Sequence, residues 1–393
     1  MKILGILLLF AYSVRTFFAQ AINIREYGDT ILILDETRKW VSQGIKWQEF
    51  GAYSPFAQLF IMPFTFLSNP KACSILYAMN WVALLGTIFL FYSSLIPQIQ
   101  KRWLLFATIL LLNFWPLAYA MRAAKIEPVE LFLIMLSLRA YQWEKKTLSA
   151  ATLAAATLLK FLPGVLVLYF LVKKDWKWLA RYSIFVGLIT LVTCGWLGVD
   201  YHIDYFRSLS GGYIPWIFNQ APEAALQRLL YTSFPPVSNV YYPNPEVGFL
   251  FRPVLIALKI GLLCWVLRVL YKRECDIFVD CGLLLLCVPF LMKFYREYYI
   301  VLALPFFFAV IRDFLQKRSG VHQNRAGIFL LGLGFFLITF LGIFEVWFTR
   351  WTPQFFPAIE NYHAIPYLSL PFWGFVFLVI SWFRIYGRKT PEF

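Results

Sequence analysis

The chain has 393 residues, of which 60% are hydrophobic and only 15% are charged, and its formal net charge is +15. Soluble domains carry about 25% charged residues, so this composition excludes an ordinary soluble protein. Several apolar runs approach or exceed about 18 residues, the length that indicates a transmembrane helix. The six cysteines form no CxxC pair, so we expect neither a disulfide framework nor a metal site. The sequence predicts an all-α polytopic membrane protein that packs as one domain over residues 1–393.

The positive charge is spread over short loops between apolar runs. Proteins that bind nucleic acid gather lysine and arginine on one face, which is not the pattern here. Basic residues in short loops are typical of the cytoplasmic side of an inner-type membrane. We therefore predict a multi-pass protein of the cell (inner) membrane, with the lipid bilayer and not nucleic acid as its partner.

The N-terminal segment, Met1–Ala21, has the general form of a signal peptide, but Arg15 interrupts its apolar part. We predict an uncleaved first helix over Ile3–Phe18. Residues 21–70 then form the first outer loop. This loop includes Phe56–Leu67, an apolar run too short to cross a bilayer. A short element at membrane depth needs cover from protein or water, so we expect Phe56–Leu67 to be re-entrant.

The remaining apolar runs complete a model of about twelve crossings with both termini inside. The predicted crossings are Ile3–Phe18, Cys73–Leu95, Leu104–Met121, Leu131–Tyr141, Leu148–Leu159, Pro163–Leu171, Ser183–Leu197, Phe249–Leu270, Ile277–Met292, Tyr299–Ile311, Ile328–Trp347 and Leu368–Ile385. Residues 198–248 form the largest outer loop. Because the two crossings around Lys160 are short for about 30 Å of hydrocarbon, we expect this lysine to lie below the outer surface.

Several charged residues fall on the outer side, against the charge bias: Asp29, Lys125, Lys160, Arg228, Lys293, Arg296 and His363. Ionisable groups near membrane depth are rare and usually functional. Cations converging on one phosphate would explain the set, because such groups stabilise a charged leaving group. In the alternative interpretation, each cation pairs with a neighbouring carboxylate or extends to lipid headgroups.

Three acids in the first outer loop are candidates for a general base, namely Asp29, Asp35 and Glu36. A carboxylate beside an apolar wall can take the proton of an acceptor hydroxyl. If the loop is helical, Asp29 and Glu36 share one face because they are seven residues apart. The residues alone do not rank the three acids, and a solvated acidic loop is an equal alternative.

The order and spacing of several short motifs resemble glycosyltransferase family 87, which has the GT-C fold. The matching stretches are Asp29 followed by Gly44, Tyr53-Ser54-Pro55, Leu159-Lys160-Phe161-Leu162-Pro163, Asn219-Gln220 with Arg228, and His363. The sequence departs from the family where Ala124-Lys125 replaces Gly-Gln, and where Tyr295-Arg296-Glu297-Tyr298 replaces Trp and His residues. These departures leave the acceptor and the sugar open.

The resemblance implies an integral membrane enzyme that moves a mannose-like hexose from a polyprenyl-phosphate donor to a lipid or glycan acceptor on the outer face. It assigns the catalytic role to Asp29. It implies that Lys160, Arg228, His363, Lys125 and Arg296 bind the donor phosphate, and that Tyr53, Asn219 and Gln220 bind substrate. It implies neither a metal nor another cofactor. The alternatives are a transporter or flippase of lipid-linked sugars, which would show inverted repeats, and an oligosaccharide ligase or polymerase.

Overall fold

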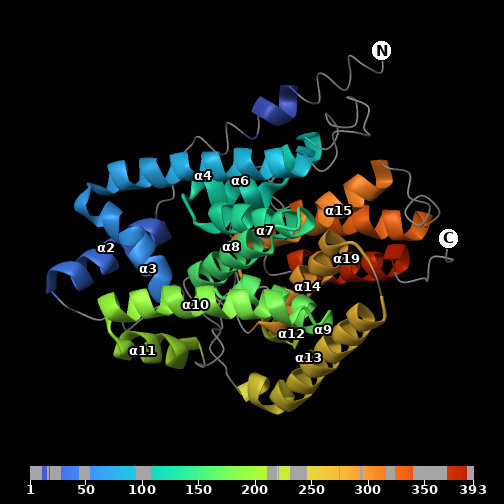
Figure 1. Ribbon diagram of the computed structural model, residues 1–393. Coiled ribbons are helices and arrows are strands. Elements are labelled where there is room, and N and C mark those ends of the chain that lie inside the picture. The colour runs from blue at the N-terminus through green and yellow to red at the C-terminus, as the bar shows by residue number, and fades with distance from the viewer. Residues whose placement is uncertain are drawn as a thin grey trace. The chain divides into compact units, whose positions relative to one another are not determined.

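The computed structural model describes residues 11–15, 17, 28–43, 54–93, 108–209, 219, 221–230, 246–273, 275–292, 295–315, 324–339 and 370–386 (Figure 1). Every regular element within these residues is helical. The prediction of an all-helical membrane protein is confirmed. The two residues Asp29 and Arg228 lie in helices whose backbone is described, but their side chains fall outside the description.

The chain groups into two compact units, the first comprising Met1–Pro97 and Leu117–Gly212 and the second comprising Gln98–Pro116 and Tyr213–Phe393. The first unit holds α2 (Gly28–Gln43), α3 (Pro55–Ile61), η1 (Met62–Phe66), α4 (Asn69–Ser93), most of α6 (Trp115–Arg122), α7 (Glu127–Gln142), α8 (Lys146–Leu159), η2 (Leu162–Leu166), α9 (Val167–Val172), α10 (Trp176–Leu197) and α11 (Val199–Leu209). The second holds α12 (Pro222–Leu230), α13 (Glu246–Lys272), α14 (Ile277–Leu291), η3 (Glu297–Ala303), α15 (Leu304–Leu315), the helix Arg325–Thr339 and α19 (Leu370–Tyr386).

Three helices in the described part of the chain are long and apolar enough to cross a membrane: α4, α10 and the Pro253–Lys272 part of α13. They correspond to three of the predicted crossings. The other apolar helices are shorter, with 10–17 residues each. The total of about twelve crossings therefore stays a prediction, as does the single-domain organisation. Most of Ile3–Phe18 lies outside the described residues.

The two predicted outer loops contain helices of their own. Helix α2 occupies 16 residues of the first loop, and α11 and α12 lie within residues 198–248. The apolar run Phe56–Leu67 forms α3, which has seven residues, and then the 3₁₀ helix η1, which has five. This agrees with the expected short, broken element.

Helix α8 is the centre of the first unit, and its alanine-rich sequence explains why. Small side chains let helix backbones approach closely, and α8 packs along both α7 and α10 (Figure 1). Ser137 of α7 donates a hydrogen bond to the Ser149 carbonyl of α8 at 2.8 Å. The indole of Trp178 in α10 donates to Ser149 Oγ at 3.0 Å. These bonds fix the three helices at one end.

Helices α8 and α10 begin at the same level but differ in length. Lys146 at the start of α8 forms an ion pair with Asp175, which caps the start of α10, at 2.9 Å. With a rise of about 1.5 Å per residue, the 14 residues of α8 extend ~21 Å and the 22 residues of α10 extend ~33 Å. Helix α8 is therefore ~12 Å shorter than the candidate span α10. Lys160 follows directly at the end of α8, and its depth below the outer surface stays a prediction.

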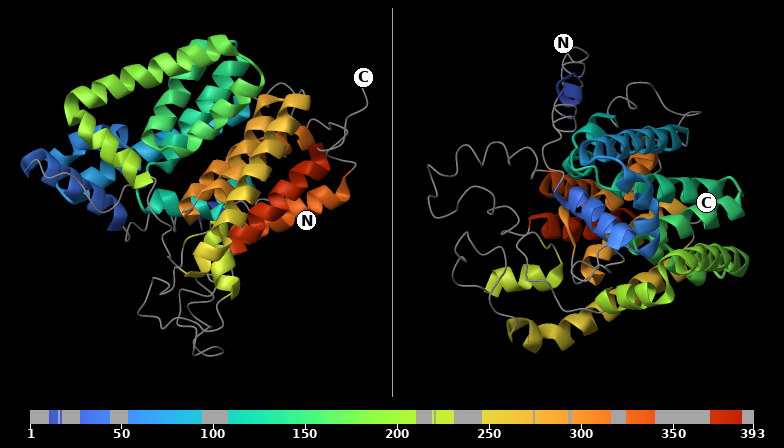
Figure 2. Two further views of the ribbon diagram at one scale, coloured as in Figure 1. Left: turned by 90° about the horizontal axis from the view of Figure 1, so that it is seen from below. Right: turned by 90° about the vertical axis from the view of Figure 1, so that its left-hand side faces the viewer.

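The second unit is built around α14, in which every residue from Ile277 to Pro289 is buried. Helices α15 and α19 pack beside it (Figure 2). At Gly282 a Cβ atom would lie 2.9 Å from the Phe306 backbone of α15, so only glycine permits this approach. The indole of Trp382 in α19 donates a hydrogen bond to the Val279 carbonyl at 3.0 Å. Close helix packing thus organises this unit as well.

Candidate active site

A buried ion pair joins the facing ends of α7 and α8. The ammonium group of Lys160 contacts Oε1 of Glu127, and the two side chains are 5% and 0% exposed. Lys160 is the C-cap of α8, where the backbone becomes extended, and Glu127 is the first residue of α7. Because the start of α7 lies beside the end of α8, both charges are found at the same end of the α7–α8 hairpin.

Two further charged side chains, Lys125 and Glu130, are buried beside this pair, with exposures of 3% and 0%. We call Lys125, Glu127, Glu130 and Lys160 the Lys160 cluster. All four side chains are enclosed by protein. Burial of a charge is costly unless it is paired, so such a cluster requires a structural or functional reason.

The turn before α7 has an unusual backbone. Ala124 adopts a left-handed backbone conformation with a φ of 49°, which residues other than glycine rarely adopt. Two hydrogen bonds hold the turn: the Lys125 N–H donates to the Ala120 carbonyl at 3.0 Å, and the amide of Asn80 in α4 donates to the Lys125 carbonyl at 2.7 Å. The backbone that carries Lys125 and Glu127 is therefore fixed by α4 as well as by α6.

The first turn of α2 lies against the same backbone turn. Thr30 is buried, and its hydroxyl donates a hydrogen bond to the Ala123 carbonyl at 2.8 Å. Asp29 is the preceding residue of α2. The hydrogen bond of Thr30 thus brings the backbone of Asp29 to the turn that leads into the Lys160 cluster.

The start of α3 contacts the end of α8. Ser54 caps α3 by accepting a hydrogen bond from the Ala57 N–H at 3.1 Å, and its hydroxyl also bonds the Leu158 carbonyl. Leu158 is two residues before Lys160. Two motifs that the sequence linked only by family resemblance, Tyr53-Ser54-Pro55 and Leu159–Pro163, therefore meet in space. Tyr53 itself lies outside the described residues.

The other two acids of α2 already have cationic partners. Asp35 forms an ion pair with Arg38 at 2.8 Å, and Glu36 forms one with Lys39 at 3.0 Å. Both are pairs of neighbours one helical turn apart. The structure thus gives Asp35 and Glu36 local partners of opposite charge.

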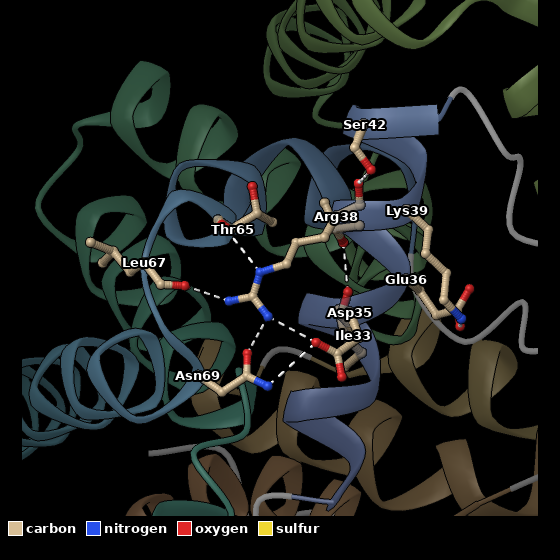
Figure 3. A network of polar contacts seen from close by, with 10 residues as sticks. Ile33, Asp35, Glu36, Arg38, Lys39, Ser42, Thr65, Leu67 and Asn69 are labelled. Atoms are coloured by element: carbon tan, nitrogen blue, oxygen red, sulfur yellow. Dashed lines mark hydrogen bonds and ion pairs between the residues drawn. The ribbon is translucent and has the colours of Figure 1, made fainter.

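The Arg38 guanidinium group also fixes the chain reversal after η1 (Figure 3). Nε donates to the Thr65 carbonyl at 2.9 Å and Nη2 to the Leu67 carbonyl at 2.5 Å. Asn69, at the start of α4, contacts both Arg38 and Asp35. Carbonyls at the end of a helix have no partner within it, and Arg38 supplies one to this short element.

The second unit contains the other predicted site residues. Asn219 is fully buried, and its side-chain oxygen accepts hydrogen bonds from the Ala221 N–H at 2.9 Å and the Tyr295 N–H at 3.0 Å. Arg296 follows Tyr295 directly. Arg228 lies on α12, which begins at Pro222. The structure therefore links the Asn219 segment to the segment of Arg296, while Gln220 and His363 lie outside the described residues.

Sequence reasoning assigned no site role to Glu127 and Glu130. Two acids one helical turn apart, directly after the Ala124-Lys125 turn, were the available signal. The role of Glu127 depends on its contact with Lys160, 33 residues away, which no local pattern reveals.

The model of glycosyltransferase family 87 matches residues 52–292. The chain belongs to this family. The match covers more than half of the sequence and includes the Lys160 cluster, Asn219 and Arg228, whereas Asp29, Arg296 and His363 lie outside it. The predicted family is confirmed, and the protein is a multi-pass membrane glycosyltransferase.

Two crystal structures of ArnT from Cupriavidus metallidurans are similar to the chain over 98% of its length and 78% of theirs. The structure bound to undecaprenyl phosphate is 12% identical with a TM-score of 0.41. The apo structure is 13% identical with a TM-score of 0.39. No curated protein sequence matches the chain.

Proposed function

We propose that this family-87 enzyme transfers a mannose-like hexose from a polyprenyl-phosphate donor to a lipid-linked or envelope acceptor on the outer face of the cell membrane. The protein has the long apolar helices that access to a lipid-anchored donor requires. The positive-inside bias of the loops supports the outer face.

One observation carries this proposal: the first turn of α2, the start of α3 and the ends of α7 and α8 converge on the Lys160 cluster. Hydrogen bonds from Thr30 and Ser54 make two of these connections. The convergence brings the backbone of the candidate base, Asp29, toward the turn that leads to a buried lysine, which we expect at membrane depth. Ionisable groups in such positions are usually functional.

The reaction is a single displacement at the anomeric carbon of the donor. The acceptor oxygen attacks this carbon, and the bond to the phosphate oxygen breaks with its electron pair remaining on the phosphate. The acceptor hydroxyl loses its proton to the Asp29 carboxylate. Attack opposite the leaving group inverts the anomeric centre, as in inverting glycosidases by analogy. The products are the glycosylated acceptor and the polyprenyl phosphate.

Cations stabilise the phosphate as it departs. Lys160 is the first candidate because it is buried at the end of α8, where a charge-assisted hydrogen bond is strong. We assign Arg228, Lys125, Arg296 and His363 to the same phosphate, and Tyr53, Asn219 and Gln220 to substrate binding. A monophosphate leaving group met by several cations does not require a metal ion.

The test compares Asp29→Asn with Asp35→Asn and Glu36→Gln in cells that lack the native gene. Asparagine is nearly isosteric with aspartate, so the fold is retained while the proton acceptor is removed. Loss of a general base lowers rates by about 10²–10⁴. We expect Asp29→Asn to abolish the glycan product measured by mass spectrometry of lipid and envelope extracts. The two control acids have local cation partners, and their variants should retain most activity.

Membrane levels of each variant are measured by immunoblotting, so that lost product is not mistaken for lost protein. Normal product from Asp29→Asn and none from Asp35→Asn would assign the base to Asp35. If none of the three substitutions alters the product, and the extracts with and without the gene are the same, the proposed transfer reaction is wrong.

A further inference from the structure

Lys160 requires a partner that holds it in place. A lysine side chain is flexible, and fixing its ammonium group costs the side chain much of its rotamer entropy. A binding group that is positioned before the ligand arrives avoids this cost at the moment of binding. In the structure the ammonium group contacts Oε1 of Glu127. Glu127 thus defines where the charge of Lys160 is placed.

Glu127 is itself rigidly placed. It is fully buried, and its backbone follows the turn that Asn80 fixes through the Lys125 carbonyl. Pro128 occupies the first turn of α7, where its fixed φ suits the helix start. A carboxylate with so little freedom is a suitable anchor for a flexible lysine.

Glu130 provides an internal comparison. It lies one turn further along α7 and is as deeply buried as Glu127. Neither of its carboxylate oxygens has a hydrogen-bond partner within the described part of the chain. It nevertheless interacts electrostatically with Lys160 and Glu127. Of these two acids, only Glu127 contacts the ammonium group directly.

We propose that Glu127 is the positioning residue of Lys160, holding the ammonium group at the end of α8 where it meets the phosphate of the lipid donor. This inference rests on the proposed function, which assigns Lys160 to that phosphate. Without Glu127, the lysine turns toward Glu130, about 5 Å further along the helix axis, and leaves the phosphate position. Glu127 therefore acts on the donor only by positioning the ammonium group of Lys160.

The test measures binding of two probes to the purified full-length protein in lipid nanodiscs: undecaprenyl phosphate, and undecaprenol, which lacks the phosphate. We expect Glu127→Gln to weaken binding of undecaprenyl phosphate about tenfold and to leave that of undecaprenol unchanged. Glu130→Gln is the matched control and should bind both probes as the wild type does. Glu127→Gln combined with Glu130→Gln removes the competing partner, so this double variant should bind the phosphate more tightly than Glu127→Gln alone.

Three results would overturn the inference. Equal losses in Glu127→Gln and Glu130→Gln, or equal losses for both probes, would indicate a general structural role. Tighter phosphate binding by Glu127→Gln would show that Glu127 competes with the donor for Lys160. If Glu127→Gln does not fold, the comparison of Glu127→Asp with Glu130→Asp replaces it, because both keep the charge and shift it by one methylene. We then expect weaker binding of undecaprenyl phosphate by Glu127→Asp but not by Glu130→Asp. Equal binding by the two variants would refute the inference.

Lys160→Met separates this inference from the proposed function. If Lys160→Met binds undecaprenyl phosphate normally, the assignment of Lys160 to the donor phosphate is wrong and the role of Glu127 falls with it. If Lys160→Met binds weakly but Glu127→Gln is normal, the assignment of Lys160 stands and only the positioning role is wrong.

Discussion

The side-chain oxygen of Asn219 accepts a hydrogen bond from the Tyr295 N–H at 3.0 Å, joining two segments that are 76 residues apart. The same oxygen accepts a second bond from the Ala221 N–H at 2.9 Å. These bonds fix the chain just before α12 against the residue that precedes Arg296. The oxygen of Asn219 therefore has a structural task, whatever its amide N–H groups bind.

The first prediction separates the structural and substrate-binding roles of Asn219. Asn219→Ala leaves two backbone N–H groups without their acceptor, and an unsatisfied buried group costs about 1–3 kcal/mol. We expect this variant to unfold at a lower temperature. Asn219→Asp keeps an acceptor oxygen but loses the amide N–H donors. Glycan formation lost in a stable Asn219→Asp variant would support the substrate-binding role, and normal activity there would restrict Asn219 to structure.

Sequence patterns predicted the helical class and the main apolar elements well. The runs Cys73–Leu95 and Ser183–Leu197 largely coincide with α4 and α10 because a spanning helix must be long and apolar. Lys160 is buried by protein, while its depth below the outer surface stays a prediction from the short crossings beside it. The length of an apolar helix can be estimated directly from the hydropathy of the sequence.

The pairing of charges could not be predicted in the same way. The patterns do not show that Thr30 bonds the Ala123 carbonyl or that Glu127 contacts Lys160, because both contacts join residues far apart in the sequence. The burial of the charged side chains in the turn before α7 was likewise not visible in the sequence. Tertiary packing of α4, α7 and α8 determined the outcome.

The second prediction concerns the chain reversal after η1. Arg38→Ala removes the donors for the Thr65 and Leu67 carbonyls and leaves Asp35 without its cation. Hydrogen bonds from charged groups contribute about 1.5–3 kcal/mol each. We expect a clear loss of thermal stability and faster proteolysis in the region of α3 and η1. Arg38→Lys should be intermediate, because an ammonium group lacks the planar fork of donors that matches several acceptors.

Lys39→Ala is the matched control for Arg38→Ala. Lys39 is the next residue of α2, and within the described part of the chain the one polar contact of its side chain is an exposed ion pair with Glu36. Exposed pairs contribute about 0–1 kcal/mol, so this variant should be nearly as stable as the wild type. A similar loss of stability in both variants would show that the charge of α2, and not the contacts of Arg38, holds this region together.

The third prediction concerns pH and the connection between α9 and α10. Asp175 caps α10 by accepting from the Trp178 N–H, and it also accepts from Lys146 and Tyr141. Burial raises the pKa of Asp175, but these hydrogen bonds and the charge of Lys146 outweigh burial and lower its pKa below the ordinary value of 3.8. A carboxylate whose pKa is lower in the folded state favours folding when it is ionised.

The stabilisation by Asp175 is fully present above the pKa of the unfolded chain, about 3.9, and is lost as the pH falls through the lower pKa of the folded state. Asp175→Asn removes the charge but keeps a good helix cap. Thermal unfolding between pH 3 and pH 7 should show the variant less stable near neutral pH by about 1 kcal/mol, the upper range for a partly exposed pair. The difference should shrink as the solution becomes more acidic than pH 4. Lys146→Met should show the same trend, because it removes the other half of the pair. A difference that is constant across this pH range would mean that the ionisation of Asp175 does not contribute to the stability of the fold.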